Sequence, residues 1–157
     1  MAQHTKLAFA LIAGGAIFAH LCQPALAEES ETRHESGNTL GVFLGDTTED
    51  RREGATLGLE FEHRFSEHYG VGVTAEHVVG DFDTNVLAIP VAVHSGPWKL
   101  YAGPGMEYSH GHGEPLLRLG AEYGFHVGEY EISPQVDVDF VDGERLLVFG
   151  LVFALEL

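Results

Sequence analysis

Apolar and polar positions alternate with a period of two residues from Gly37 to the end of the chain. In the first such segment the apolar positions are Leu40, Val42 and Leu44, and the last runs from Leu147 to Leu157. An alternation of this kind is typical of a strand with one apolar and one polar face, whereas a helix repeats every ~3.6 residues. The region after Gly37 is therefore predicted to be all-β.

Seven connections divide this region into eight predicted strands, and they lie around residues 46–54, 66–70, 80–85, 95–98, 109–115, 127–130 and 141–145. Most of the strands run about 9–12 residues, whereas strands of water-soluble proteins cluster near about 5–6. A tilted strand that crosses a membrane needs about 9–11 residues. The strand lengths therefore favour a membrane-spanning barrel.

The connections also alternate in kind. The first, third, fifth and seventh are acidic and polar, and the other three are tight and carry Tyr69, Trp98 and Tyr130. An even-stranded barrel with both termini in the periplasm would place the acidic connections outside the cell and the aromatic residues at the periplasmic interface. Periodicity alone leaves open a second architecture, a soluble periplasmic barrel that buries its apolar face and binds a small apolar ligand.

Residues 1–27 have the organisation of a secretory signal peptide. Lys6 gives a positive start, residues 7–19 are apolar, and Ala25 and Ala27 precede a predicted cleavage between Ala27 and Glu28. The apolar run is shorter than the roughly 20 residues of a spanning helix. Residues 28–37 are polar and acidic and are predicted to form a short disordered lead-in, so the barrel domain covers residues 38–157. The single cysteine, Cys22, is removed with the signal.

The chain is strongly acidic, with 24 Asp and Glu against 8 Lys and Arg and a formal net charge of −16. Removal of Lys6 with the signal peptide makes the mature chain more acidic still. Binding to nucleic acid requires a basic surface that contacts phosphates. The composition therefore excludes nucleic acid as a partner.

The end of the chain carries a resemblance to a known family. Apolar residues occupy alternate positions back from Leu157 through Leu155, Phe153, Leu151 and Phe149, which resembles the C-terminal assembly signal of bacterial outer-membrane barrels. The departure is Leu157, where that signal usually ends in Phe. Residues 38–157 thus resemble the small eight-stranded outer-membrane β-barrel proteins. The resemblance implies a closed antiparallel up-and-down transmembrane barrel in the cell outer membrane. It also implies insertion by the barrel-assembly machinery, contact with outer-membrane lipids and lipopolysaccharide, and a monomeric state.

In a membrane barrel the polar strand face lines a narrow interior. By strand parity this face carries a predicted network of charges: Glu60, Glu62, Arg64, Glu76, Glu107, Arg118, Glu122, Asp137 and Asp139. Each arginine is expected to bridge carboxylates by forked hydrogen bonds, because an unpaired buried charge is costly. Two arginines cannot neutralise this many acids. Some carboxyls are therefore expected to be hydrated, protonated or bound to a cation.

A second candidate site is the loop with His110, His112 and Glu114. Two imidazoles and a carboxylate at alternate positions are ligands that suit Zn²⁺, Cu²⁺ or Ni²⁺. The loop lacks a fourth ligand in sequence, so only weak divalent-metal binding is expected, and no other cofactor is predicted.

Two prolines define a third feature. If the predicted strands pair through a turn at Gly96 and Pro97, then Pro90 and Pro104 fall nearly opposite each other and remove ladder hydrogen bonds. A seam weakened in this way could admit an acyl chain sideways, as in barrel enzymes that modify lipid A. Ser95 beside His94, and Ser109 beside His110, are the nearest pairs to a nucleophile and base, but neighbours in a strand point to opposite faces.

The sequence thus predicts a small outer-membrane barrel with a plugged polar interior, no open pore and a structural or surface-interaction role. A lipid-A-modifying acyl hydrolase or acyltransferase is the first alternative, and the soluble ligand-binding barrel is the second.

Overall fold

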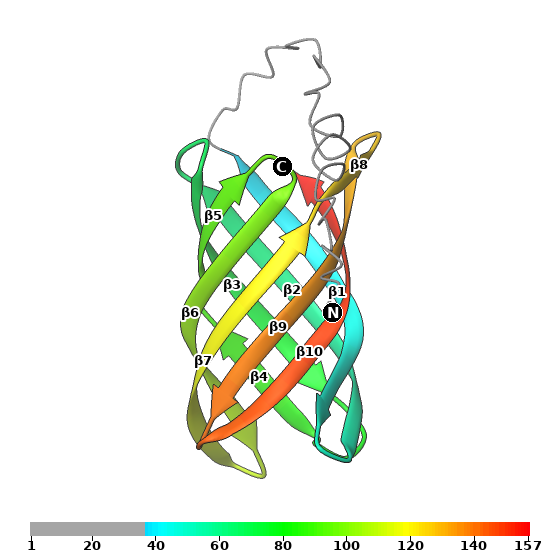
Figure 1. Cartoon of the computed structure of the whole chain (residues 1–157), viewed down its shortest axis with the longest axis vertical. Helices are drawn as coiled ribbons and strands as arrows, with labels where there is room; N and C mark the ends of the chain where they lie inside the picture. Colours follow the sequence, from blue (N-terminus) through cyan, green and yellow to red (C-terminus); the bar gives the residue numbers. More distant parts are fainter. Residues whose placement is uncertain (1–36) are drawn as a thin grey trace, which may run out of the picture. The chain divides into compact units, whose positions relative to one another are not determined.

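The computed structural model describes residues 37–157, which form one antiparallel sheet closed into a barrel (Figure 1). Within this range no helix is long and apolar enough to cross a membrane. The predicted signal peptide and its cleavage site lie outside the described residues, as does the lead-in up to residue 36. Ten strands make up the sheet, and they are β1 (Asn38–Glu49), β2 (Arg52–Arg64), β3 (Tyr69–Val78), β4 (Thr84–Ala88), β5 (Val91–Ser95), β6 (Trp98–Ser109), β7 (His112–Tyr123), β8 (Phe125–Val127), β9 (Tyr130–Val141) and β10 (Glu144–Glu156).

Two of the barrel strands are interrupted. β4 and β5 both lie between β3 and β6 and are separated only by Ile89 and Pro90, and β8 continues β7 after Gly124. The ten segments therefore form eight barrel strands in chain order. Pairing of β1 with β10, from Thr39 opposite Glu156 to Thr48 opposite Leu147, closes the barrel. The predicted closed eight-stranded, up-and-down barrel is confirmed.

The two ends of the barrel differ in their turns. One end, called the terminal end below, carries Asn38, Leu157 and the turns after β2, β5 and β8; the other, called the acidic end, carries the turns after β1, β3, β6 and β9. Three acidic-end turns have only two residues, and at His110–Gly111 and Asp142–Gly143 both φ angles are positive, between 45° and 84°. Such turns match the twist of a hairpin, and Gly, Asn and Asp are the residues that favour them.

The predicted connections at the acidic end were too long. The segment 46–54 was expected to be a connection, but Thr47 pairs with Gly54 and Glu49 with Arg52, so only Asp50 and Arg51 lie outside the strands. The segments 109–115 and 141–145 shorten in the same way to residues 110–111 and 142–143. Polar side chains do not end a strand, because the backbone ladder forms whether or not the side chains are apolar.

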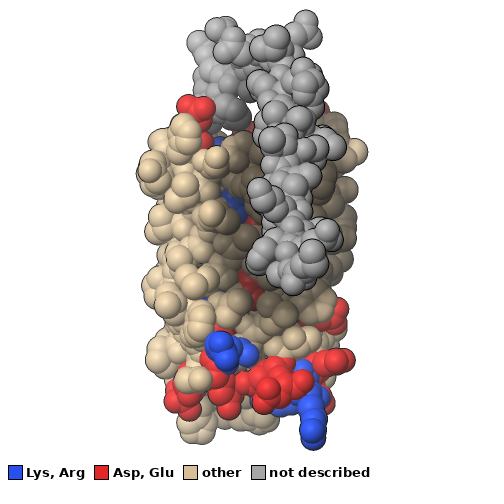
Figure 2. All heavy atoms as spheres, viewed as in Figure 1, with Lys and Arg blue, Asp and Glu red and all other residues tan. Residues whose placement is uncertain are grey.

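The outer wall is apolar, and the interior contains both apolar and polar side chains. The side chains of Leu44, Leu59 and Leu100 are 50%, 58% and 55% exposed, whereas their inward neighbours Phe43, Glu60 and Tyr101 are buried. On the face seen in Figure 2, charged residues gather at the acidic end and the wall is almost wholly uncharged. A soluble barrel would bury the apolar strand face inside, whereas here the apolar face points outward. The soluble alternative is therefore wrong.

Aromatic side chains gather on the outer wall at the terminal end. Trp98 contacts Tyr123, and Tyr123 contacts Phe125, with ring centroids 4.9 Å apart in both pairs. Phe65 and Tyr69 stack at 6.5 Å in the turn after β2. Aromatic rings at this level are typical of the membrane interface of a barrel. The tight connections with Tyr69, Trp98 and Tyr130 therefore share the terminal end, and their position at the periplasmic interface stays a prediction.

Candidate functional site

The candidate site is the interior of the barrel, which has three levels. An apolar cluster lies towards the acidic end, an arginine–carboxylate network lies behind it, and a charged cavity opens at the terminal end. The apolar cluster consists of Val78, Phe82, Val86, Leu116, Val141 and Leu146. Phe82 belongs to the connection after β3, yet its side chain is 4% exposed and its ring carries the Arg52 guanidinium at 4.3 Å. Phe82 thus turns inward and covers the acidic-end mouth.

Arg118 is the centre of the buried network. Its guanidinium forms a forked pair with Glu76, in which Nη2 donates to Oε2 at 2.7 Å and Nη1 donates to Oε1. A second fork joins it to Asp139, with Nε donating to Oδ1 at 2.8 Å and Nη2 to Oδ2 at 2.7 Å. The Arg118 side chain is fully buried, so these bonds operate with little screening by water. The forked bridge predicted for Arg118 is present.

Asp137 receives the remaining donors of this level. Tyr101 Oη donates to Oδ1 at 2.5 Å, and Gln135 Nε2 donates to Oδ2 at 2.7 Å. The Arg118 Nη1 atom lies 3.8 Å from Oδ2. Gly120 makes this arrangement possible, because a Cβ at that position would collide with the Tyr101 ring and with Asp137.

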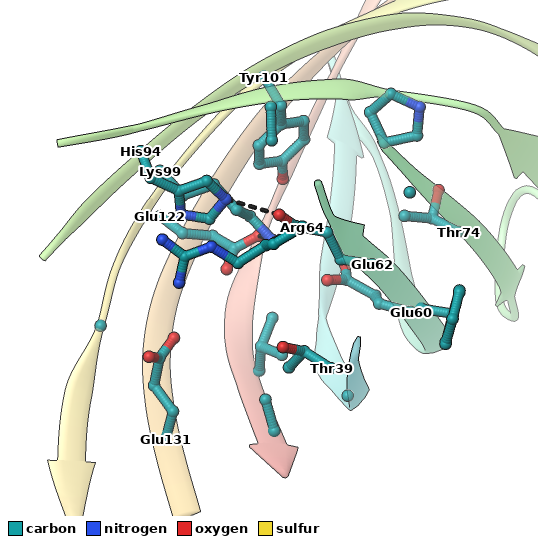
Figure 3. A pocket seen from close by; sticks show the side chains of 18 of the residues that line it. Thr39, Glu60, Glu62, Arg64, Thr74, His94, Lys99, Tyr101, Glu122 and Glu131 are labelled. Atoms are coloured by element: carbon teal, nitrogen blue, oxygen red, sulfur yellow. Dashed lines mark hydrogen bonds and ion pairs between the residues drawn. The ribbon is translucent and has the colours of Figure 1, made fainter. Parts of the chain in front are cut away.

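A cavity of about 150 Å³ lies between this network and the terminal end (Figure 3). On one side of it, Lys99 Nζ lies 2.5 Å from Glu122 Oε1 and 3.4 Å from Glu62 Oε2. His94 Nε2 lies 2.6 Å from Glu62 Oε1, and Lys99 sits over the Tyr101 ring at 5.2 Å. This side of the cavity is therefore internally paired.

Three members of this group were not among the predicted network residues. Lys99 has the same strand parity as Tyr101 and thus points inward, so parity could have found it. His94 and Tyr101 also occupy inward positions, beside Ala92 on β5 and Lys99 on β6, so the same parity identifies them. Among the described residues, the network and the cavity together hold more carboxylates than cations: Glu60, Glu62, Glu76, Glu122, Glu131, Asp137 and Asp139 against Arg64, Lys99 and Arg118.

Two predicted network members lie apart from it. Arg64 ends β2 at the terminal end and lines the cavity (Figure 3), and its Nη2 donates to the backbone carbonyl of Glu67 at 2.9 Å. Within residues 37–157 it does not form the predicted fork with a carboxylate. Glu107 lies near the acidic end on β6, opposite Val86 on one side and Glu114 on the other. It forms no salt bridge within the described range.

The histidine loop is a tight hairpin turn. His110 is exposed with φ 51°, and its Nδ1 lies 2.8 Å from Ser109 Oγ. His112 and Glu114 lie on the same face of β7, and both are exposed. Across residues 37–157, no three His, Cys, Asp or Glu side chains come together in a way that could hold a metal ion. Metal binding at His110, His112 and Glu114 stays a prediction.

The seam at the prolines is held by backbone hydrogen bonds. Pro90 falls opposite Gly103, next to Pro104. The Ile89 amide donates to the Pro104 carbonyl at 2.9 Å, and the Gly72 amide donates to the Pro90 carbonyl at 2.8 Å. Gly103 allows the two backbones to approach closely, since a Cβ there would overlap Ile89 and Pro90. The prolines interrupt the strand without opening the wall.

Solved structures share this fold. No family model and no curated protein sequence matches the chain. The N-terminal β-barrel domain of Pseudomonas aeruginosa OprF matches with a TM-score of 0.58 and 10% identity, covering 78% of this chain and 100% of that one. The Yersinia pestis outer membrane protein Ail in a phospholipid nanodisc matches with a TM-score of 0.51 and 11% identity, over 78% and 100%.

A de novo designed transmembrane β-barrel matches as well, with a TM-score of 0.53 and 15% identity over 78% of this chain and 96% of that chain. The chain therefore has the fold of the small eight-stranded outer-membrane barrels. Because a designed barrel shares it, the fold by itself specifies no activity.

Proposed function

We propose that this chain is an integral protein of the outer membrane, with a closed interior and a structural or surface-interaction role. The observation that supports this most is the combination of an apolar outer wall with an interior that is blocked between the acidic end and the cavity. A strand lattice of this length spans a bilayer of about 30 Å when it is tilted. The fold shared with outer-membrane barrels agrees with this location.

Both apolar and charged side chains block the interior of the barrel. Phe82 and its cluster fill the acidic-end mouth, and the forked Arg118–Glu76 pair reaches from β7 to β3 behind them. Phe43 fills the interior beside β10 and is fully buried, in contact with Val148 and Val152. An eight-stranded barrel has room for such side chains but leaves no water-filled channel.

The proposed orientation has the terminal end in the periplasm and the acidic end outside the cell. It is supported by the position of Asn38 and Leu157 at the terminal end, because an even-stranded barrel with its ends in the periplasm places the turns after β1, β3, β6 and β9 outside the cell. In this arrangement the barrel contacts outer-membrane lipids and lipopolysaccharide along its wall, acts as a monomer and reaches the membrane through the barrel-assembly machinery.

An enzymatic role finds little geometric support. Ser109 and His110 are brought together by their turn, but His110 is exposed and no carboxylate orients its ring within the described range. A nucleophile–base pair needs such a partner for hydrolysis. An acyl-release assay on lipopolysaccharide with Ser109→Ala as the control separates the two functions, and we expect no release from either protein.

The main test has two measurements. After washing of membranes with alkaline carbonate, the protein is expected to stay in the membrane fraction, since its wall is apolar. In planar lipid bilayers the purified protein is expected to give no unitary conductance steps. Recovery of the protein in the carbonate supernatant would refute the integral location, and regular open-channel steps would refute the closed interior.

A further inference from the structure

The cavity at the terminal end has two unlike sides (Figure 3). On one side His94, Lys99 and Glu122 come together with Glu62, and their charges are paired. Glu60 and Thr74 lie on the other side. They come from adjacent strands and are direct partners in the ladder between β2 and β3.

Both of these side chains are buried, and each keeps a polar atom without a partner. Glu60 is 8% exposed and Thr74 is 5% exposed. Neither Glu60 Oε1 nor Thr74 Oγ1 has a hydrogen-bond partner among the described residues, and both residues line the cavity. Burying an acceptor without a partner costs about 1–3 kcal/mol, and more when the acceptor is charged. The two atoms therefore form an incomplete acceptor site.

The charges of the interior indicate which kind of ligand would complete this acceptor site. The cations of the interior and cavity are engaged elsewhere: Lys99 by Glu62 and Glu122, Arg118 by Glu76 and Asp139, and Arg64 by the Glu67 carbonyl. Glu60 is thus a carboxylate of the cavity lining that forms no salt bridge with these cations within the described range. A ligand that brings positive charge and hydrogen-bond donors would satisfy both Glu60 and Thr74.

The donor set favours an organic cation over a metal ion. No group of three or more metal-ligating side chains converges anywhere in residues 37–157. A primary ammonium carries three N–H donors and needs no fixed coordination geometry. The rest of the lining includes apolar surface from Pro90, Ala92, Val152 and Ala154, which suits an alkyl chain.

The cavity is small, and it is reached from one end. Its volume of about 150 Å³ has room for roughly five water-sized groups, because a water molecule takes about 30 Å³ in the liquid. Its lining includes Gly96, Pro97 and His126, which belong to the terminal end of the barrel and are exposed. A ligand would therefore enter from the terminal end, while Phe82 and its cluster close the other mouth.

We propose that the barrel binds a small primary alkylammonium ion in this cavity, with the ammonium group held between the Glu60 carboxylate and the Thr74 hydroxyl. Glu60 Oε1 and Thr74 Oγ1 accept N–H bonds, and the short alkyl chain lies against the apolar lining. The assignment does not depend on the structural role proposed above, because the cavity belongs to the barrel itself.

The test uses n-butylammonium and 1-butanol, which have the same number of non-hydrogen atoms and differ in charge. Each is titrated calorimetrically into the folded full barrel in non-ionic detergent, with empty micelles as the blank. We expect saturable binding of n-butylammonium and none of 1-butanol. Glu60→Gln, which keeps the side-chain shape, is expected to weaken binding by about tenfold or more, the effect of losing a charged hydrogen bond. Thr74→Val is expected to weaken it by a smaller factor.

Matched controls make the outcome decisive. Glu114→Gln removes the same charge at an exposed position outside the cavity and is expected to leave binding unchanged, and heat-dependent electrophoretic mobility verifies that each variant is folded. Equal binding by wild type and Glu60→Gln, an equal loss in Glu114→Gln, or saturable binding of 1-butanol would each overturn the proposal. Binding of Mg²⁺ alone that requires Glu60, without binding of n-butylammonium, would also overturn it.

Discussion

Arg118 on β7 reaches through the barrel interior to Glu76 on β3, and the two side chains meet in a forked ion pair with no exposure of the guanidinium to solvent. The same guanidinium holds Asp139 on the neighbouring β9. One side chain therefore connects three barrel strands, and its loss leaves several buried carboxylates without compensation.

We expect Arg118→Leu to lower the free energy of unfolding by about 3–5 kcal/mol, the usual cost of removing one partner from a buried ion pair. The measurement is urea unfolding of the barrel in detergent micelles, followed by far-UV circular dichroism. Arg145→Leu, at an exposed position near the acidic end, serves as the control and should change the free energy by less than about 0.5 kcal/mol. Equal unfolding midpoints for the two variants would contradict a supporting role of Arg118.

Phe43 and Phe149 test the difference between interior and wall. Phe43 is fully buried inside, and its ring needs the space left by Gly45 and Gly150, where an added Cβ would come within 2.8 Å of it. Phe43→Ala leaves an interior cavity that the surrounding barrel cannot close, so we expect the free energy of unfolding to fall by about 3–5 kcal/mol. Phe149→Ala removes the same atoms from the outer wall, where lipid or detergent can fill the gap. The same urea experiment should show a smaller loss for Phe149→Ala, and the reverse order would contradict the assigned faces.

The environment of Glu49 at the acidic end predicts that the stability of the barrel depends on pH. Glu49 lies five residues beyond Leu44, outside the apolar wall. Burial raises the pKa of its carboxyl above the usual value, and the neighbouring Glu144 raises it further, while Arg52 acts in the opposite direction. A carboxyl whose pKa is higher in the folded state favours folding when protonated, so its contribution is lost as pH rises through the folded-state pKa. Glu49→Gln should therefore equal wild type in stability below the usual Glu pKa and exceed it at neutral pH.

The expected gain is at most about 0.5 kcal/mol, because the pair is near the surface and screened. The readout is the difference in unfolding free energy between Glu49→Gln and wild type across pH 4 to 7, which cancels the other titrating groups. Glu114→Gln provides the control. A difference that does not change with pH would show that Glu49 does not titrate in this way.

Trp98 is the only tryptophan in the chain and reports the depth of the terminal end. It is 51% exposed on the outer wall beside Tyr123, at the level expected for the membrane interface. In bilayers with brominated lipids, its fluorescence should be quenched more by bromines near the headgroup than by bromines near the chain ends. Strongest quenching at the bilayer centre would place this ring of aromatic residues in the wrong part of the membrane.

Much of the fold could be predicted from the sequence because barrel strands impose a strict period of two. The faces of Leu44, Leu59 and Leu100 and the inward position of Arg118 follow from parity alone. Strand ends could not be predicted in this way. Thr47, Glu53 and Gly54 are polar or small, and their inclusion in the ladder depends on backbone pairing and on the two-residue turn at residues 50–51.

The site was harder to predict for a related reason. Phe82 lies in a connection without periodicity, so nothing in the pattern indicates that its ring turns into the barrel mouth. The pairing of Lys99 with Glu122 depends on which strands face each other across the interior, and so does the lack of a partner for Glu60 Oε1 among the described residues. Sequence parity identifies the inward side chains but not their opposite partners.

The two-residue turns at residues 50–51, 110–111 and 142–143 have a consequence for accessibility. A protease must bind several residues of extended, unpaired chain, and these hairpins offer almost none. Antibodies and bacteriophages that recognise long loops would meet the same lack of material. In the proposed orientation, the side outside the cell displays charge but only one connection longer than two residues, residues 79–83, so whole cells are expected to resist surface shaving of this barrel.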